Sequence, residues 1–406
     1  MLNGLRALDL TDEKGFLCGK ILGDLGVDVL KIEPHGGDPA RYIGPFYGGV
    51  RNPEKSLYWF MYNSSKRGIT LNIEATAGQR IFKKLLKTAD FVIESFPIGY
   101  MDKLGLGYVD LNKINSRIIH TSITPFGQTG PYRDYKASDL IVMAMSGLMH
   151  VTGDSDRPPL RPGFDQAYAL TGLNAAVGTL FAHHYRQFSD EGQFVDVSMY
   201  ECVVRANYRD PGRWQLNKEV ARRSGNCIIR GRVINRLAWP CQDGYICWSF
   251  MTGEWAAKAN RTFVQWMDEE GKAGTLKQIE WEKVDQSQMT QQQVDYYEEH
   301  FGRFFLAHTV EELEKESMKR GLSMVRVANI EQVAKNEQLA ARHYWRRIEH
   351  AELGTDITYP GNFFVASGCG IRFRAPLIGE HNEQVYKKEL GLSNEEISDL
   401  RRSDVI

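Results

Sequence analysis

Residues 5–33 read LRALDLTDEKGFLCGKILGDLGVDVLKIE, and this stretch decides the fold. The apolar run 5–10 predicts a buried strand, residues 11–14 form a polar turn, and 27–33 is a second apolar run of strand length. The residues between the turn and the second run, 15–25, have the composition of a helix. A strand, a helix and a strand in this order predict a βαβ unit, and therefore a parallel sheet.

Three glycines of the predicted helix, Gly15, Gly19 and Gly23, follow one another at intervals of four. Residues four apart lie on one face of a helix. Each Gly costs a helix interior about 1 kcal/mol relative to Ala. We therefore expect another segment of backbone to approach this face closely.

The alternation of strands and helices continues along the chain. Further strands are expected at 68–73, 90–94, 118–123 and 195–199, and further helices at 76–87, 139–150 and 170–186. Short strands that alternate with helices of about ten residues predict an α/β fold with a doubly wound parallel sheet.

The composition changes after about residue 205, because seven of the eight tryptophans lie from Trp214 to Trp345. This change predicts a second, smaller α+β domain. The expected boundaries are 1–204 and 345–406 for a large Rossmann-like domain, 205–225 for a linker, 226–325 for the small domain and 326–344 for a return linker. The small domain is thus expected to be an insertion in the large one.

The chain has 406 residues, is 42% hydrophobic and carries a formal net charge of -1. This balance argues against a nucleic-acid partner, which requires a basic face. The longest apolar run, 140–149, is half the length of a bilayer span, and the N-terminus lacks the residue order of a signal peptide. The six cysteines form no Cys-x-x-Cys pair, which is typical of a reducing cytosol. We expect a cytoplasmic protein without a membrane or nucleic-acid partner.

The common cofactor and metal motifs are missing from the sequence. The glycines of the first helix do not have the G-x-G-x-x-G spacing that binds a dinucleotide pyrophosphate. His183 and His184 are adjacent in a predicted helix, so their side chains point about 100° apart and do not converge on one metal ion. We expect no metal and no permanently bound cofactor.

A set of short motifs, spread in order over nearly the whole chain, is more informative than any of them alone. The motifs are LGDLGVDVLKIE at 22–33, GDPAR at 37–41, NSSKRGITLN at 63–72, IESF at 93–96, LGLGY at 104–108, FGQTGPY at 126–132, AMSGLM at 144–149 and LIGEHN at 377–382. Together they resemble the class III coenzyme A-transferases, the family of formyl-CoA transferase and carnitine CoA-transferase.

The resemblance implies a fold and a substrate. Members of the family pair as two interlocked rings, each with a large Rossmann-like domain, a small domain and two long linkers, and CoA thioesters are their substrates. CoA carries a pyrophosphate and a 3′-phosphate. The cations Arg41, Lys66, Arg67 and Lys103, together with Phe96, are the residues expected to hold it, because we place them just after successive strands, where α/β proteins bind ligands. The alternative for each cation is a solvated surface charge.

The nucleophile of the family is replaced in this chain. In the family an aspartate attacks the acyl-CoA thioester, and it stands four residues before a Gly at the start of a helix of small residues. The matching glycine is Gly172, so the position falls on Tyr168. A phenol has a pKa of about 10 and is a poor substitute for a carboxylate at neutral pH. The nearest carboxylate is Asp165, either a displaced nucleophile or an ordinary loop or capping acid.

Two other departures lie near the expected CoA site. The family has Asn-Phe-Arg-Pro-Gly where this chain has Ser-Phe-Pro-Ile-Gly at 95–99, and the family's Gly-Pro step in the first loop is replaced by residues 13–16. We therefore expect no catalytic residue in this chain. The resemblance implies a non-catalytic subunit of a heteromeric CoA-transferase, which works with a homologous catalytic subunit as heterodimer or heterotetramer. Its expected reaction moves CoA from an acyl-CoA such as succinyl-CoA to a carboxylic acid, with (R)-benzylsuccinate of anaerobic toluene degradation as the expected acceptor.

Three alternatives remain open at this point. The first is an active homodimer that uses Asp165 as nucleophile. The second is an acyl-CoA racemase of the same fold, which is disfavoured because Ser138 stands where the racemase has its His. The third is a scaffold or regulatory protein that retains the fold without serving an enzyme.

Overall fold

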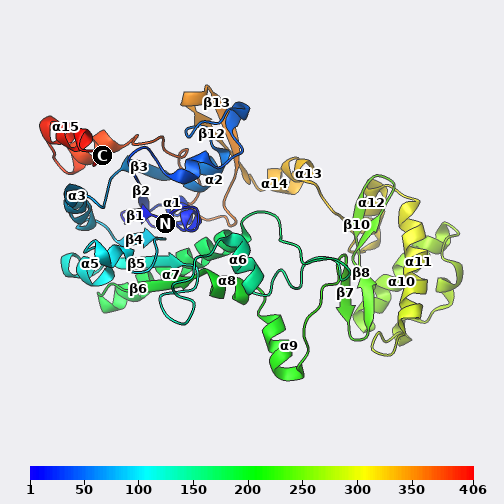
Figure 1. The fold of residues 1–406 in the computed structure, drawn as a ribbon. Helices are drawn as coiled ribbons and strands as arrows, with labels where there is room; N and C mark the ends of the chain where they lie inside the picture. Colours follow the sequence, from blue (N-terminus) through cyan, green and yellow to red (C-terminus); the bar gives the residue numbers. More distant parts are fainter. The chain divides into compact units, whose positions relative to one another are not determined.

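The computed structural model describes residues 1–406, except for the side chain of Trp255. It divides into two compact units (Figure 1). The first unit comprises residues 1–148, 162–212 and 337–406, and the second comprises 149–161 and 213–336. The chain therefore passes between the units four times.

The first unit is built on a six-stranded sheet in the order β3-β2-β1-β4-β5-β6, with every neighbouring pair parallel. The strands are β1 (Arg6–Leu10), β2 (Asp28–Glu33), β3 (Lys66–Thr70), β4 (Phe91–Glu94), β5 (Ile119–Thr124) and β6 (Phe194–Ser198). This confirms the predicted α/β fold and the position of each predicted strand. The largest difference is at β3, which begins two residues before the predicted 68–73, since two basic residues that read as a turn are its first members.

Helices connect and cover these strands. They are α1 (Phe16–Asp24), α2 (Leu57–Asn63), α3 (Thr76–Leu86), α4 (Tyr100–Lys103), α5 (Tyr108–Ile114), α6 (Asp139–Met145), α7 (Gln166–Ser189), α8 (Met199–Ala206), α14 (Glu337–Ala341) and α15 (Asn394–Arg402). A further helix, α9 (Arg209–Asn217), contains the boundary between the two units. A hairpin of β12 (Trp345–His350) and β13 (Thr355–Pro360) follows α14. The helix predicted at 170–186 is longer at both ends, and the segment predicted as a linker at 205–225 contains α9.

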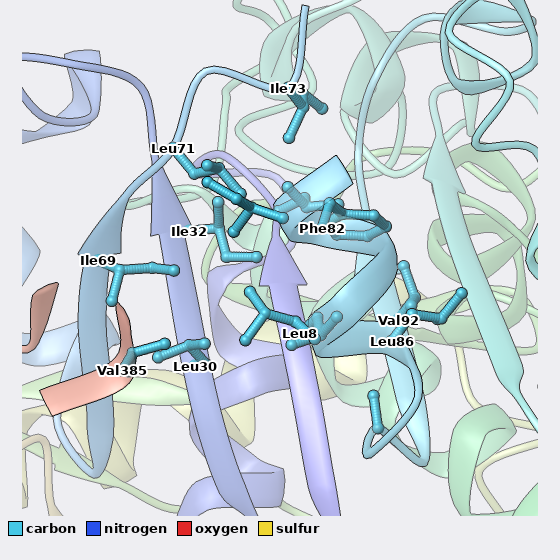
Figure 2. Packing of buried hydrophobic residues seen from close by; sticks show 14 of the residues in the cluster. Leu8, Leu30, Ile32, Ile69, Leu71, Ile73, Phe82, Leu86, Val92 and Val385 are labelled. Atoms are coloured by element: carbon cyan, nitrogen blue, oxygen red, sulfur yellow. The ribbon is translucent and has the colours of Figure 1, made fainter. Parts of the chain in front are cut away.

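The largest apolar core lies between the sheet and α3. Leu8 of β1, Leu30 of β2 and Ile69 of β3 pack there with Phe82 of α3, and all four are fully buried. Val385, from the end of the chain, lies in the same cluster (Figure 2). The last residues of the chain thus complete a core that its first residues begin.

The second unit has two small sheets, one of β9, β10 and β11 and one of β7 and β8, and a core rich in aromatic residues. Its elements are β7 (Cys227–Arg230), β8 (Val233–Arg236), β9 (Ala238–Pro240), β10 (Tyr245–Cys247), α10 (Glu254–Glu269), α11 (Gln291–Leu306), α12 (Val310–Arg320), β11 (Val325–Arg326) and α13 (Ile330–Ala334). Trp239, Trp248, Phe263 and Phe305 pack together in its core. Across the described residues of both units, no helix combines the length and apolar composition that a bilayer crossing requires.

The glycine face of α1 is closely packed, and the predicted approach of other backbone is found at Gly23, whereas Gly15 and Gly19 lie against side chains. A Cβ added at Gly23 would lie 2.8 Å from the carbonyl oxygen of Ser65, and one at Gly19 would lie 2.1 Å from Oδ2 of Asp9. On α7, a Cβ at Gly172 would lie 2.7 Å from Cβ of Leu17. Glycine therefore allows α1 to pack closely both against the segment entering β3 and against α7.

Replacing Gly23 by Ala is expected to lower the free energy of unfolding by about 1–3 kcal/mol, because the methyl group meets backbone that does not move aside easily. Gly212 in α9 is the matched control, since a Cβ there meets nothing within 4 Å. Gly212→Ala should leave stability unchanged or raise it by up to about 1 kcal/mol. Urea denaturation of both variants measures the difference, and equal stabilities would contradict the prediction.

Candidate active site

Tyr168 lies in the first turn of α7, at the start of the predicted helix of small residues. The side chain is half-buried. Burial raises the pKa of Tyr168 to about 12; a backbone hydrogen bond at Asp139 lowers it, and the charges of Glu13, Asp12 and Asp139 raise it. The hydroxyl is therefore protonated throughout the neutral pH range. It cannot attack a thioester as an ionised carboxylate does.

Asp165 occupies the N-cap position of α7, but its side chain does not cap the helix. Its Oδ2 instead accepts a hydrogen bond of 3.5 Å from the hydroxyl of Tyr58. The ring of Tyr58 lies against that of Tyr62, with centroids 4.8 Å apart. The pKa of Tyr62 is raised by burial and by the charge of Asp165. Asp165 thus stands among phenols just before the helix, three residues from Tyr168.

The anion at the start of α7 is Asp139, the first residue of α6. It is buried, and its Oδ1 accepts a hydrogen bond of 2.8 Å from the backbone N–H of Ala167. A carboxylate at this place satisfies a free N–H of the first turn and interacts favourably with the helix dipole. Sequence reasoning missed this role, because Asp139 lies 28 residues before its partner; the only signal is an acid at the start of the preceding helix.

Further carboxylates surround the same helix start. Asp12 and Glu13 lie in the loop after β1, and their charges act on Tyr168. The pKa of Glu13 is raised by burial and by the charge of Asp12. Lys14 forms an ion pair with Asp12, which neutralises part of this charge. The region around Tyr168 is consequently acidic.

Two of the predicted CoA-binding cations are fully buried in ion pairs. The guanidinium of Arg41 contacts both carboxylate oxygens of Glu33, at 2.6 and 2.8 Å, and stacks on the ring of Trp59. The ammonium of Lys66 donates to Oδ2 of Asp9 at 2.8 Å and to two further oxygens, the carbonyl of Phe16 and Oδ1 of Asn63. An ammonium has three donors, so in this structure Lys66 has none left for a phosphate.

The remaining predicted residues are more accessible. Arg67 pairs with Asp28 and Glu389, Phe96 lies against Tyr100 with ring centroids 4.5 Å apart, and Lys103 is exposed at the end of α4.

The expectation that the cations follow successive strands is wrong for Lys66 and Arg67. These two residues are the first two of β3, so their backbone lies at the amino end of that strand. Phe96 and Lys103, by contrast, follow the carboxyl end of β4. Contact of any of the five residues with CoA stays a prediction.

An apolar cavity of about 460 Å³ lies beside the first turns of α7. Its wall includes Leu17 and Ile21 of α1, Tyr62 of α2, and Leu170 and Leu173 of α7. The start of α7 therefore combines an acidic side around Tyr168 with an apolar side that faces α1.

Comparison with known proteins agrees with the sequence motifs. The model of the family "CoA-transferase family III" matches residues 2–382. The chain is 32% identical to the succinyl-CoA:(R)-benzylsuccinate CoA-transferase subunit BbsE of Thauera aromatica, over 99% of this chain and 97% of that protein. It is 30% identical to the succinyl-CoA–L-malate CoA-transferase beta subunit of Chloroflexus aurantiacus, over 100% and 98% of the two chains.

Comparison with solved structures shows a similar fold over nearly the whole chain. The fold is similar to that of a CAIB/BAIF family protein from Brucella suis, with a TM-score of 0.82 and 25% identity over 95% of this chain and 98% of that one. The match of the family model spans the first unit and the second. This chain therefore belongs to the class III CoA-transferase family, whose members act on CoA thioesters.

Proposed function

We propose that this chain is a non-catalytic subunit of a heteromeric CoA-transferase, and that a homologous subunit supplies the nucleophilic aspartate. The observation that carries the proposal is Tyr168 at the start of α7. A protonated phenol stands where the reaction needs a carboxylate, and burial keeps its pKa at about 12.

The charge around Tyr168 supports the same proposal. A CoA thioester brings phosphate groups, and a mixed anhydride forms only when an anion attacks its carbonyl. The charges of Asp12, Glu13 and Asp139 act on Tyr168, and like charges repel one another. These carboxylates therefore disfavour a further anion beside Tyr168.

The donor and acceptor follow from the relatives. Both relatives described above are named for succinyl-CoA as the donor, and each is named as a subunit. We infer that the complex takes CoA from succinyl-CoA and passes it to a carboxylic acid, with (R)-benzylsuccinate as the proposed acceptor. The cytoplasm is the proposed location.

A row of exposed apolar side chains along α7 is the proposed contact surface for the catalytic subunit. The row, which we call the α7 stripe, consists of Leu173, Val177, Phe181, Tyr185 and Phe188. Intervals of three and four residues place these side chains on one helix face. Leu173 also lines the apolar cavity, so the stripe begins at the edge of that cavity. Apolar surface of this extent typically marks a protein interface.

The test is a CoA-transfer assay with succinyl-CoA and (R)-benzylsuccinate. The purified chain should transfer no CoA, and co-expression with a homologous subunit that carries Asp at the position of Tyr168 should give an active complex. A chain that is active by itself would contradict the proposal.

Asp165 is the alternative nucleophile, and one substitution separates the two cases. Asp165→Asn should leave the activity of the complex within about twofold of the wild type, since the Asn side chain still accepts a hydrogen bond from Tyr58. The matched variant removes the nucleophilic Asp of the catalytic subunit and should abolish activity. A loss of several orders of magnitude in Asp165→Asn, with a covalent acyl adduct on this chain in mass spectra, would favour the active homodimer. If the purified chain is inactive and no catalytic homologue co-purifies with it from cells, the result would favour the hypothesis that the chain is a scaffold protein.

A further inference from the structure

A cavity of about 310 Å³ lies beside α4 and α5, and no residue of α7 lines it. Glu94 of β4, His120 and Ser122 of β5, and Tyr108 of α5 contribute to its wall, together with Phe194 of β6. His120 and Ser122 are two residues apart on one strand, so their side chains lie on the same face of the sheet. None of the carboxylates around Tyr168 lines this cavity.

The imidazole of His120 is the unusual group in this wall. Its side chain is 97% buried, and among the described residues neither ring nitrogen has a hydrogen-bond partner. The nearest ionisable atom is Oε1 of Glu94, 3.7 Å from Nε2, which is too long for a hydrogen bond. The ring of Phe194 stands edge-on at 5.2 Å. Leaving buried polar atoms unpaired costs about 1–3 kcal/mol each, so such groups call for an explanation.

The charged residues in the wall of the cavity are acidic, which indicates the charge of a ligand that could bind there. Glu94 and Asp102 both line it, and among the described residues that line it there is neither Lys nor Arg. Glu94 is buried, and its Oε2 accepts the N–H of Phe96 at 2.7 Å, which fixes the carboxylate in place. A carboxylic acid would be repelled by these two carboxylates. A cation that donates hydrogen bonds would be attracted to it.

The aromatic rings point to the same class of ligand. The rings of Tyr108 and Phe194 are 5.8 Å apart, and both lie in the wall with Glu94. Aromatic faces bind ammonium groups, by about 0.5–2 kcal/mol each. A volume of about 310 Å³ is at the lower end of the range of ligand cavities and fits a compound with one small ring.

We propose that this cavity binds the ammonium group of a small organic amine. The carboxylate of Glu94 is the counter-ion, a ring nitrogen of His120 accepts one N–H of the ammonium, and Tyr108 and Phe194 enclose its apolar part. Neither Tyr168 nor Asp165 lines this cavity, and the proposal does not depend on whether this chain is the non-catalytic subunit.

The first test uses the wild-type full-length chain and three probes of nearly equal shape, measured by isothermal titration calorimetry. Benzylammonium should bind with a Kd of about 1 mM, a value typical of a fragment with few contacts. Benzyl alcohol should bind at least about tenfold more weakly, and benzoate should not bind. Equal affinity for the alcohol or the benzoate, or no heat from the amine at about 50 mM, would overturn the proposal.

The second test uses variants with a matched control. Glu94→Gln should weaken benzylammonium about tenfold or more, and His120→Phe should weaken it several-fold. Asp110→Asn is the control, because this carboxylate lies on α5, pairs with Lys113 and does not line the cavity. Unchanged affinity in folded Glu94→Gln would contradict the assignment.

Should Glu94→Gln fail to fold, histidine-labelled NMR of the wild-type chain decides instead. The imidazole signals of His120, assigned with His120→Phe, should shift on addition of benzylammonium and stay in place with benzyl alcohol. Signals that do not respond to the amine would overturn the proposal.

Discussion

Lys66→Met is expected to lower the free energy of unfolding of the first unit by about 3–5 kcal/mol, because it leaves the carboxylate of Asp9 buried without its partner. Both side chains are fully buried and lie 2.8 Å apart. Burial by itself would raise the pKa of Asp9; the charges of Lys66 and Lys31 and hydrogen bonds from Lys66 and Thr11 outweigh it, so the pKa is lowered. Asp9 therefore stays ionised, and the structure requires the cation.

Urea denaturation with hydrogen exchange resolved to the peptides of β1 and β3 measures this effect. Lys113→Met is the control, since its pair with Asp110 is exposed to solvent and is expected to contribute little to stability. The double variant Asp9→Asn with Lys66→Met should lose less than Lys66→Met alone, because it removes both charges of the pair and leaves neither one buried without the other. A loss under about 1 kcal/mol in Lys66→Met would show that the pair is not structural.

Placing glutamates on the α7 stripe is expected to weaken the complex with the catalytic subunit about 100-fold or more. Phe181 and Phe188 are 72% and 78% exposed and lie two turns apart on one face. Burying a Phe contributes about 1.5–3 kcal/mol, and a tenfold change in affinity corresponds to about 1.4 kcal/mol. Two residues thus account for at least two orders of magnitude, and burial of their replacement charges adds to the loss.

The measurement is analytical ultracentrifugation of Phe181→Glu with Phe188→Glu, mixed with the catalytic subunit. Met318→Glu is the control, because Met318 is equally exposed but lies on the polar helix α12. The control should assemble like the wild type, and circular dichroism should show the same helix content in both. If the stripe variant forms the complex at the same protein concentrations as the wild type, the catalytic subunit binds elsewhere.

The sheet was predictable from the sequence because its strands are short apolar runs at regular intervals. The β1, β2, β4 and β5 strands are buried nearly throughout, and burial on both faces produces the apolar runs that are easiest to recognise. The position of Tyr168 was predictable for another reason: it depends on a count back from Gly172, and the helix has the register that the count assumes.

The roles of the charged residues could not be predicted in the same way. Lys66 and Asp9 are 57 residues apart, and only the parallel register of β1, β2 and β3 brings them together. The sequence shows that Arg41 is charged but not that it is buried. A basic residue after a strand can bind a phosphate group or form a buried ion pair, and the sequence does not distinguish the two. The capping of α7 by Asp139 and the unpaired imidazole of His120 likewise depend on tertiary contacts.

The position of Val385 in the core of β1, β2 and β3 has a consequence for synthesis. A ribosome completes those three strands early, but the residues that close their core emerge only after the whole second unit has been made. During this interval the nascent sheet presents apolar side chains to the solvent, a state that favours aggregation. We therefore expect the chain to depend on cellular chaperones during translation, and a version truncated before residue 377 to collect in inclusion bodies.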